Sequence, residues 1–327
     1  MKLRVPFLQF PLLFNAEALA AEIHGIDKSA WRPHPQGFPG NDALALISTG
    51  GDPNSDALSG SMRPTEHLQR CPYLMQVLDS VGATWGRTRL MRLSGQAEVT
   101  QHVDVNYYWR ERVRVHVPIV TQPTVRFLCG DAQINMRAGE CWIFDTWRMH
   151  NVINDHALAR IHLVADTVGG AGFWENVTHG RPHDRDIPGW RPRRIEPDAN
   201  KRPSLDFESV NAPTVMSPWE VREHIVFMLG EVIPHPQLPL VQQALWTFAR
   251  RWHGLWSCHG EDFAGWPRYR SLIESTRQDL IANGIKELGL RNGVPLGQAI
   301  ESCIFEPGLA DRGVYVDAEY RRQQGTT

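Results

Sequence analysis

Cysteine is scarce in this chain of 327 residues. Its five cysteines stand at positions 71, 129, 141, 258 and 303, an odd number without any Cys-x-x-Cys motif. This pattern argues against a disulfide framework and favours the reducing cytoplasm as the protein's location. Cys129 and Cys141 lie in apolar, strand-like runs, so we expect both to be buried free thiols.

Long hydrophobic runs and an excess of one charge are also missing. No apolar run approaches the ~20 residues of a membrane span. The N-terminus imitates a signal peptide, but Pro6, Gln9 and Pro11 interrupt its apolar stretch. We therefore expect an edge strand and then a short helix over 15–24 that ends at Gly25. The formal net charge of −2 argues against nucleic acid and against an anionic membrane surface as partners.

The residues that are present indicate two parts joined by a segment. Hydrophobic residues make up 42% and charged residues 21%, as in ordinary soluble globular proteins. Residues 1–168 contain short strand-like stretches between turn signals, which favours an antiparallel sandwich or jelly roll with flanking helices. Residues 169–203 are rich in glycine, proline and basic side chains and predict a linker or an active-site lid.

Residues 204–327 are predicted to form a mostly helical domain. Ser217-Pro218-Trp219-Glu220 is a capping box with proline at the first helical position, and the helix should continue towards Leu229. Further helices are expected over about 240–252 and 269–282. We expect the tryptophans of this half to form an aromatic core: Trp246, Trp252, Trp256 and Trp266.

The most informative motif is His102-Val103-Asp104. Residues i and i+2 of a strand point the same way, so His102 and Asp104 share one face. His150 stands downstream, and Arg160 follows it by ten residues. Two histidines and one carboxylate with open neighbouring positions are the ligand set of a non-haem Fe(II) oxygenase. By itself, the motif fits a surface His and Asp in polar contacts equally well.

A strand with one cationic and one aliphatic face follows the motif. Its cationic residues are Arg112, Arg114 and His116, which alternate with valines. If the valines are buried outside a barrel, these cations face its mouth and need an anion, which a dicarboxylate cosubstrate would supply. Arg160 and His162 share a face of a later strand, and the planar fork of arginine binds carboxylates bidentately. A solvated basic strand face is the alternative.

As an ordered set, these motifs resemble the aspartyl/asparaginyl β-hydroxylase family, including its bacterial free-proline hydroxylase branch. The resemblance covers about residues 70–168, and no single motif in it is specific. The motifs are Arg89-Leu90-Met91-Arg92-Leu93, His102-Val103-Asp104, Arg114-Val115-His116-Val117-Pro118, Gly139-Glu140-Cys141-Trp142, His150 and Arg160-Ile161-His162-Leu163-Val164.

The resemblance implies a double-stranded β-helix, a cupin-like jelly roll, that holds Fe(II) through His102, Asp104 and His150. It places Arg160 at the distal carboxylate of 2-oxoglutarate, with Arg114 and His116 at the other end near the metal. Arg112 stays an alternative to Arg114, because the run between the motifs is longer than in some relatives.

The implied activity uses O₂ and 2-oxoglutarate to hydroxylate a C–H bond of an amino acid, free or within a peptide, and releases succinate and CO₂. The retained carboxylate of Asp104 disfavours halogenation, for which that ligand is typically replaced.

Several residues leave alternatives open. His162 is either an outer partner of the metal site or a satisfied core histidine. Tyr107, Tyr108 and Trp109 either line the substrate pocket or pack at the barrel rim. Four further histidines form a second metal site or, in the simpler interpretation, serve loop polarity and helix ends: His179, His183, His253 and His259.

Two competing functions remain at this stage. The barrel pattern alone also fits a non-catalytic cupin-like protein that binds a metal or a small acid. The helical half is a protein-interaction module, a support for the barrel or a homodimer interface.

Overall fold

The computed structural model describes residues 1–34 and 37–309, and these form two compact units. The first unit contains Met1–Asp104 and Glu111–Ser209. The second contains Val105–Arg110 and the described residues from Val210 onwards. Within the described ranges, every helix is too short or too polar to span a bilayer.

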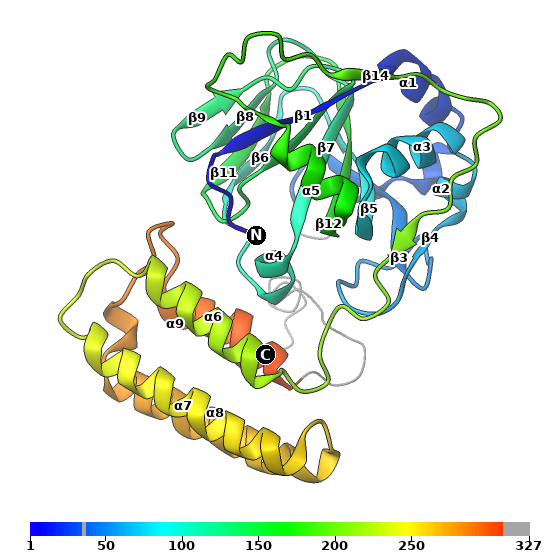
Figure 1. Ribbon diagram of the computed structural model, residues 1–327. Coiled ribbons are helices and arrows are strands. Elements are labelled where there is room, and N and C mark those ends of the chain that lie inside the picture. The colour runs from blue at the N-terminus through cyan, green and yellow to red at the C-terminus, as the bar shows by residue number, and fades with distance from the viewer. Residues whose placement is uncertain (35–36, 310–327) are drawn as a thin grey trace. The chain divides into compact units, whose positions relative to one another are not determined.

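The centre of the first unit is a double-stranded β-helix built from consecutive strands (Figure 1). The chain alternates between a large and a small antiparallel sheet. In the large sheet the order is β10-β7-β12-β5, and in the small sheet it is β6-β11-β8-β9. The strands are β5 (Thr84–Leu93), β6 (Ala97–His102), β7 (Val113–Val120), β8 (Arg126–Cys129), β9 (Ala132–Ile134), β10 (Glu140–Phe144), β11 (His150–Asn154) and β12 (Arg160–Gly169). This alternation confirms the predicted jelly roll.

Further strands widen the large sheet on both sides. The full order is β13-β1-β10-β7-β12-β5-β3-β2, while β14 pairs with β1, β15 with β5 and β4 with β3. These strands are β1 (Phe7–Phe14), β2 (Arg32–Pro33), β3 (Asn41–Thr49), β4 (Met62–Pro64), β13 (Arg181–Pro182), β14 (Arg193–Ile195) and β15 (Asp206–Phe207). The segment 169–203, for which the composition predicts a linker or lid, thus carries two strands that pair with β1.

Helices cover the outer face of the large sheet and bury its aliphatic side chains. The helices of this unit are α1 (Ala16–His24), η1 (Lys28–Ala30), α2 (Glu66–Gln69), α3 (Pro72–Val81) and α5 (Ala171–Thr178). Asn15 caps α1 by accepting from the Ala18 N–H, and the helix has the predicted length. Val113, Val115 and Val117 of β7 join the core beneath these helices. The alternating arginine and histidine side chains of β7 therefore face the space between the two sheets.

The second unit is helical, as the sequence predicts. Its elements are α4 (Tyr107–Glu111), α6 (Pro218–Glu231), α7 (Leu238–His259), η2 (Phe263–Gly265), α8 (Trp266–Ala282), η3 (Ile285–Glu287), α9 (Leu296–Ile300), the π-helical turn η4 (Glu301–Phe305) and α10 (Glu306–Gly308). The predicted capping box of Ser217 and Glu220 is present at the start of α6. Of the four tryptophans, Trp252 and Trp266 are buried. Gly254 does not end α7, which continues beyond the predicted 240–252 to His259.

Candidate active site

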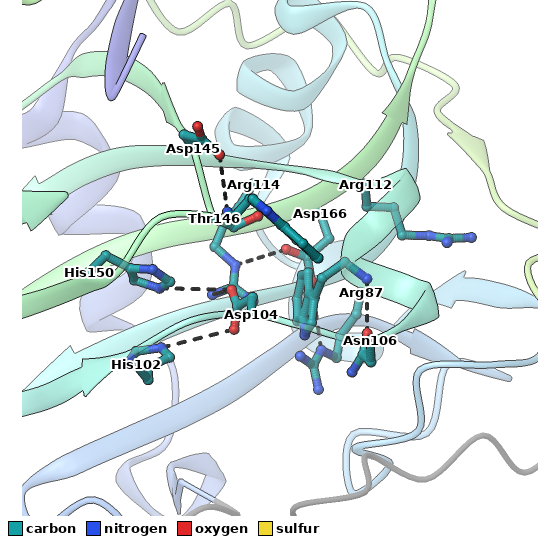
Figure 2. A network of polar contacts seen from close by, with 12 residues as sticks. Arg87, His102, Asp104, Asn106, Arg112, Arg114, Asp145, Thr146, His150 and Asp166 are labelled. Atoms are coloured by element: carbon teal, nitrogen blue, oxygen red, sulfur yellow. Dashed lines mark hydrogen bonds and ion pairs between the residues drawn. The ribbon is translucent and has the colours of Figure 1, made fainter. Parts of the chain in front are cut away.

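The structure brings His102, Asp104 and His150 together at one end of the small sheet. His102 ends β6 and His150 begins the neighbouring strand β11, with the two residues directly paired. One potential ligand atom from each of the three residues lies within 4.8 Å of the others. Figure 2 shows both imidazoles directed towards the carboxylate. Asp104 Oδ1 lies 4.0 Å from His102 Nε2, and Asp104 Oδ2 lies 3.9 Å from His150 Nε2.

Both histidines are oriented for metal binding by the backbone. Nδ1 of His102 lies 2.8 Å from the Thr100 carbonyl oxygen, and Nδ1 of His150 lies 2.8 Å from that of Arg148. A carbonyl oxygen only accepts, so each Nδ1 carries a proton, and Nε2 is the ring nitrogen that faces the carboxylate. Burial lowers the pKa of His150 to about 4, which leaves its imidazole neutral near pH 7.

The polar atoms at the centre of the group fit a divalent cation. Nε2 of His150 and Oδ2 of Asp104 are buried without a hydrogen-bond partner among the described residues. Burial by itself would raise the pKa of Asp104, but Arg114, His150 and His102 hold that pKa below its ordinary value. The carboxylate is therefore ionised. Two imidazoles and one carboxylate on one side of a point form the donor set of a facial triad.

Arg114 is the cation that contacts the triad. Its Nη1 lies 3.3 Å from Asp104 Oδ2, and its Nε donates to Asp166 Oδ1 at 3.1 Å (Figure 2). Arg114 and Asp166 are cross-strand partners on β7 and β12, so the sheet register places them on the same face. Arg87 Nε on β5 lies 3.9 Å from the other oxygen of Asp166.

Arg112 has a different role from Arg114. Its guanidinium donates to both carboxylate oxygens of Glu208 at 3.0 to 3.1 Å, and both side chains are buried. Glu208 follows β15, far along the chain, and no sequence pattern connects it with Arg112. This ion pair separates the two arginines that the sequence left as alternatives, because Arg114 contacts the triad carboxylate whereas Arg112 pairs with Glu208.

Arg160, His116 and His162 lie deeper between the sheets. Arg160 is only 3% exposed, and both ring nitrogens of His116 and of His162 lack hydrogen-bond partners among the described residues. The two imidazole centroids are 5.9 Å apart. Burial, reinforced by Arg160, lowers the pKa of each histidine well below its usual range. The buried guanidinium of Arg160 thus lies near two neutral imidazoles, and its Nε and Nη1 donors have no acceptor among the described residues.

Sequence reasoning missed further members of the site. Arg89 on β5 is 5% exposed, and its Nη1 has no hydrogen-bond partner in the described chain. Burial, with Arg87 and Arg114 nearby, lowers the pKa of Arg89 to about 9. Arg89, Val164 and His116 are successive cross-strand partners, so they share the inner face. The alternation Arg87-x-Arg89 on a predicted strand is the signal that would have identified this pair.

The remaining candidates are resolved by burial and packing. In the part of the chain that the structure describes, the triad is the sole group of three or more His, Cys, Asp or Glu residues that fits a metal. Tyr107, Tyr108 and Trp109 are buried in α4, which is grouped with the helical unit. Cys129 and Cys141 are free and buried as predicted, and burial raises the pKa of the Cys129 thiol to about 12.

Parts of this chain are similar in sequence to known proteins. Residues 44–169 match the model of the family described as aspartyl/asparaginyl beta-hydroxylase. L-proline cis-3-hydroxylase 1 of Streptomyces sp is 25% identical over 183 residues, which cover 54% of this chain and 61% of that protein.

Among solved structures, a Pseudomonas putida prolyl-4-hydroxylase has a TM-score of 0.35 at 16% identity, covering 50% of this chain and 92% of that one. A Burkholderia pseudomallei oxidoreductase of the 2OG-Fe(II) oxygenase family has a TM-score of 0.33 at 11% identity, covering 47% and 80%. Both scores are too low to support an argument of their own. The match over residues 44–169 confirms that this chain resembles the aspartyl/asparaginyl β-hydroxylase family, as its ordered motifs predict.

Proposed function

We propose that this protein is an Fe(II)- and 2-oxoglutarate-dependent dioxygenase that hydroxylates a C–H bond of an amino acid. One observation carries the proposal: His102, Asp104 and His150 converge, and each histidine places Nδ1 on a backbone carbonyl oxygen and directs Nε2 towards the same carboxylate. The match to the aspartyl/asparaginyl β-hydroxylase family supports it.

Separate residues of the site would bind the metal and the cosubstrate. His102, Asp104 and His150 would hold the metal. Arg160 would bind the distal carboxylate of 2-oxoglutarate, because its buried guanidinium has unused donors and a planar fork that matches a carboxylate. His116 would lie along the cosubstrate near its metal-binding end. Bound Fe(II), 2-oxoglutarate and O₂ supply the chemistry, in which C–H hydroxylation is coupled to the release of succinate and CO₂.

Arg89 is a further basis for the proposal, because its buried guanidinium would bind an acidic group of the substrate. It lies on the inner face beside Arg87 and Arg114, and of these three arginines only Arg114 and Arg87 have a carboxylate neighbour given by the described contacts. A buried cation with an unused donor is stabilised by an anion. The carboxylate of an amino acid fits this position, in line with the amino-acid substrate named for the Streptomyces relative.

An anaerobic titration with Fe(II) and 2-oxoglutarate tests the proposal. The expected result is a weak metal-to-ligand charge-transfer band in the wild-type protein that His150→Ala abolishes. A panel of free amino acids and short peptides should then include a substrate that increases succinate formation. A band without succinate for any substrate would indicate a non-catalytic metal-binding protein, and the lack of a band would refute the proposal.

A further inference from the structure

The segment Val105–Arg110 connects the proposed metal ligand Asp104 with the chain that leads to Arg114, but it belongs to the helical unit. It begins directly after the proposed metal ligand Asp104. It ends just before Arg112, and Arg114 follows on β7. The chain therefore leaves the β-helix at one site residue and returns shortly before another, so any displacement of this segment moves both of its ends.

One face of α6 contacts this segment. Tyr107 Oη donates to Glu220 Oε1 at 2.9 Å, and the Tyr107 and His224 rings meet at 5.6 Å. The guanidinium carbon of Arg110 lies 3.7 Å from the centroid of the Phe227 ring. Glu220, His224 and Phe227 are four and three residues apart, which places them in one row along the helix.

The capping box of α6 orients the acceptor of Tyr107. The other carboxylate oxygen of Glu220 accepts from the backbone N–H and the hydroxyl of Ser217, at 3.1 and 2.8 Å. Glu220 therefore has both oxygens engaged, one at the start of its own helix and one at Tyr107. Because the capping box restrains the glutamate, it also restrains the tyrosine.

A second contact reaches the residue next to the metal ligand. The hydroxyl of Ser302 lies 3.3 Å from the carbonyl oxygen of Val105 and 2.9 Å from that of Gln298, and the two oxygens share its single proton. Ser302 lies in the π-helical turn Glu301–Phe305. Such turns are rare and occur mostly where a helix is adapted to a function. Two separate parts of the helical unit thus hold the segment, one at Tyr107 and one at Val105.

We infer that the helical unit positions the metal ligand Asp104, with Tyr107 and Ser302 as positioning residues that act through the segment Val105–Arg110. This inference rests on the proposed metal site and assigns a role to the helical unit. The helices need not capture a partner to be required for activity. They fix the conformation of the segment that joins Asp104 to the chain before β7, and thereby restrain the backbone at the carboxylate ligand.

The test compares Tyr107→Phe with Tyr269→Phe in the full-length chain. Both substitutions remove one hydroxyl hydrogen bond within the helical unit, since Tyr269 donates to the Gly260 carbonyl at 2.9 Å. Tyr269 has no described hydrogen bond to the segment. Binding of Co(II), followed by its ligand-field absorption, measures the site without turnover. We expect Tyr107→Phe to weaken Co(II) binding about tenfold, in the range seen for lost outer partners of metal ligands, and to alter the absorption band.

Tyr269→Phe should bind Co(II) with wild-type affinity and spectrum. Circular dichroism checks the fold of both variants, and if Tyr107→Phe does not fold, Ser302→Ala replaces it with the same expected direction. Equal Co(II) binding by Tyr107→Phe and the wild type would overturn the inference while leaving the proposed function intact. Equal losses in Tyr107→Phe and Tyr269→Phe would also overturn it, because they would indicate general destabilisation. A wild-type chain that binds no Co(II) would instead refute the proposed function.

Discussion

Replacement of Arg160 by methionine should make the free protein more stable and unable to bind 2-oxoglutarate. Arg160 is 3% exposed, and its Nε and Nη1 lack hydrogen-bond partners among the described residues. A buried, unpaired cation destabilises a fold until a ligand neutralises it. Methionine keeps an unbranched side chain in the same space but removes the charge. The two effects therefore have opposite signs, which a purely structural role for Arg160 would not produce.

The size of the effect follows from the pKa of Arg160. Burial lowers that pKa from its ordinary value to about 10. At about 1.4 kcal/mol per pH unit, the difference corresponds to about 3 kcal/mol against the charged form near pH 7. We therefore expect Arg160→Met to raise the free energy of unfolding of the free protein by about 1–3 kcal/mol. For the wild type, 2-oxoglutarate at a hundred times its dissociation constant should add about 2.7 kcal/mol.

Urea unfolding with and without 2-oxoglutarate, in the presence of Mn(II), measures both effects. The matched control is Arg126→Met on β8, because the Arg126 side chain is 40% exposed and its ion pair with Asp155 lies at the surface. This control should change neither the stability nor the response to 2-oxoglutarate appreciably. Destabilisation of the free protein by Arg160→Met, or equal stabilisation of the variant and the wild type by 2-oxoglutarate, would contradict this prediction.

Three further predictions concern other buried charges. Arg112→Met should lower the free energy of unfolding by about 3–5 kcal/mol because it leaves Glu208 buried and unpaired, whereas a double variant with Glu208→Leu should recover much of the loss; urea titration measures both. Arg89→Met should weaken binding of the amino-acid substrate about thirtyfold or more, the equivalent of about 2 kcal/mol, and calorimetry should find 2-oxoglutarate binding unchanged. Burial lowers the pKa of His224 to about 3, below its ordinary 6.5, so this residue reduces the free energy of unfolding as the pH falls from 6.5 towards 3. His224→Phe should reduce that loss by up to about 1.4 kcal/mol per pH unit. An unchanged pH dependence of the free energy of unfolding would contradict this prediction.

Local sequence patterns were sufficient to predict the main helices and strands and most of the candidate site residues. The i, i+2 spacing predicts that one strand carries both His102 and Asp104, but β6 ends at His102 and Asp104 lies just beyond it. The valines of β7 alternate with Arg114 and His116 as predicted. These periods depend only on backbone geometry, so they can be read without tertiary contacts. The caps at Asn15 and Ser217 are equally local, because each uses a side chain within three residues of its partner.

The contacts that distinguish similar residues depend on distant parts of the chain. Arg112 and Arg114 are two residues apart and carry the same charge, and the position of Glu208 shows which one is engaged away from the triad. The sequence also does not show that the segment Val105–Arg110 belongs to the helical unit, because Tyr107 and its partner Glu220 are 113 positions apart in the chain.

The sequence by itself thus determined the donor set of the proposed metal site and the jelly roll that carries it. Only the tertiary structure decided which cations remain without partners and which unit holds the segment after Asp104. The physical reason is that strand and helix periods are properties of the local backbone, whereas the pairing of a buried charge is decided by whichever remote side chain folding brings within hydrogen-bond distance.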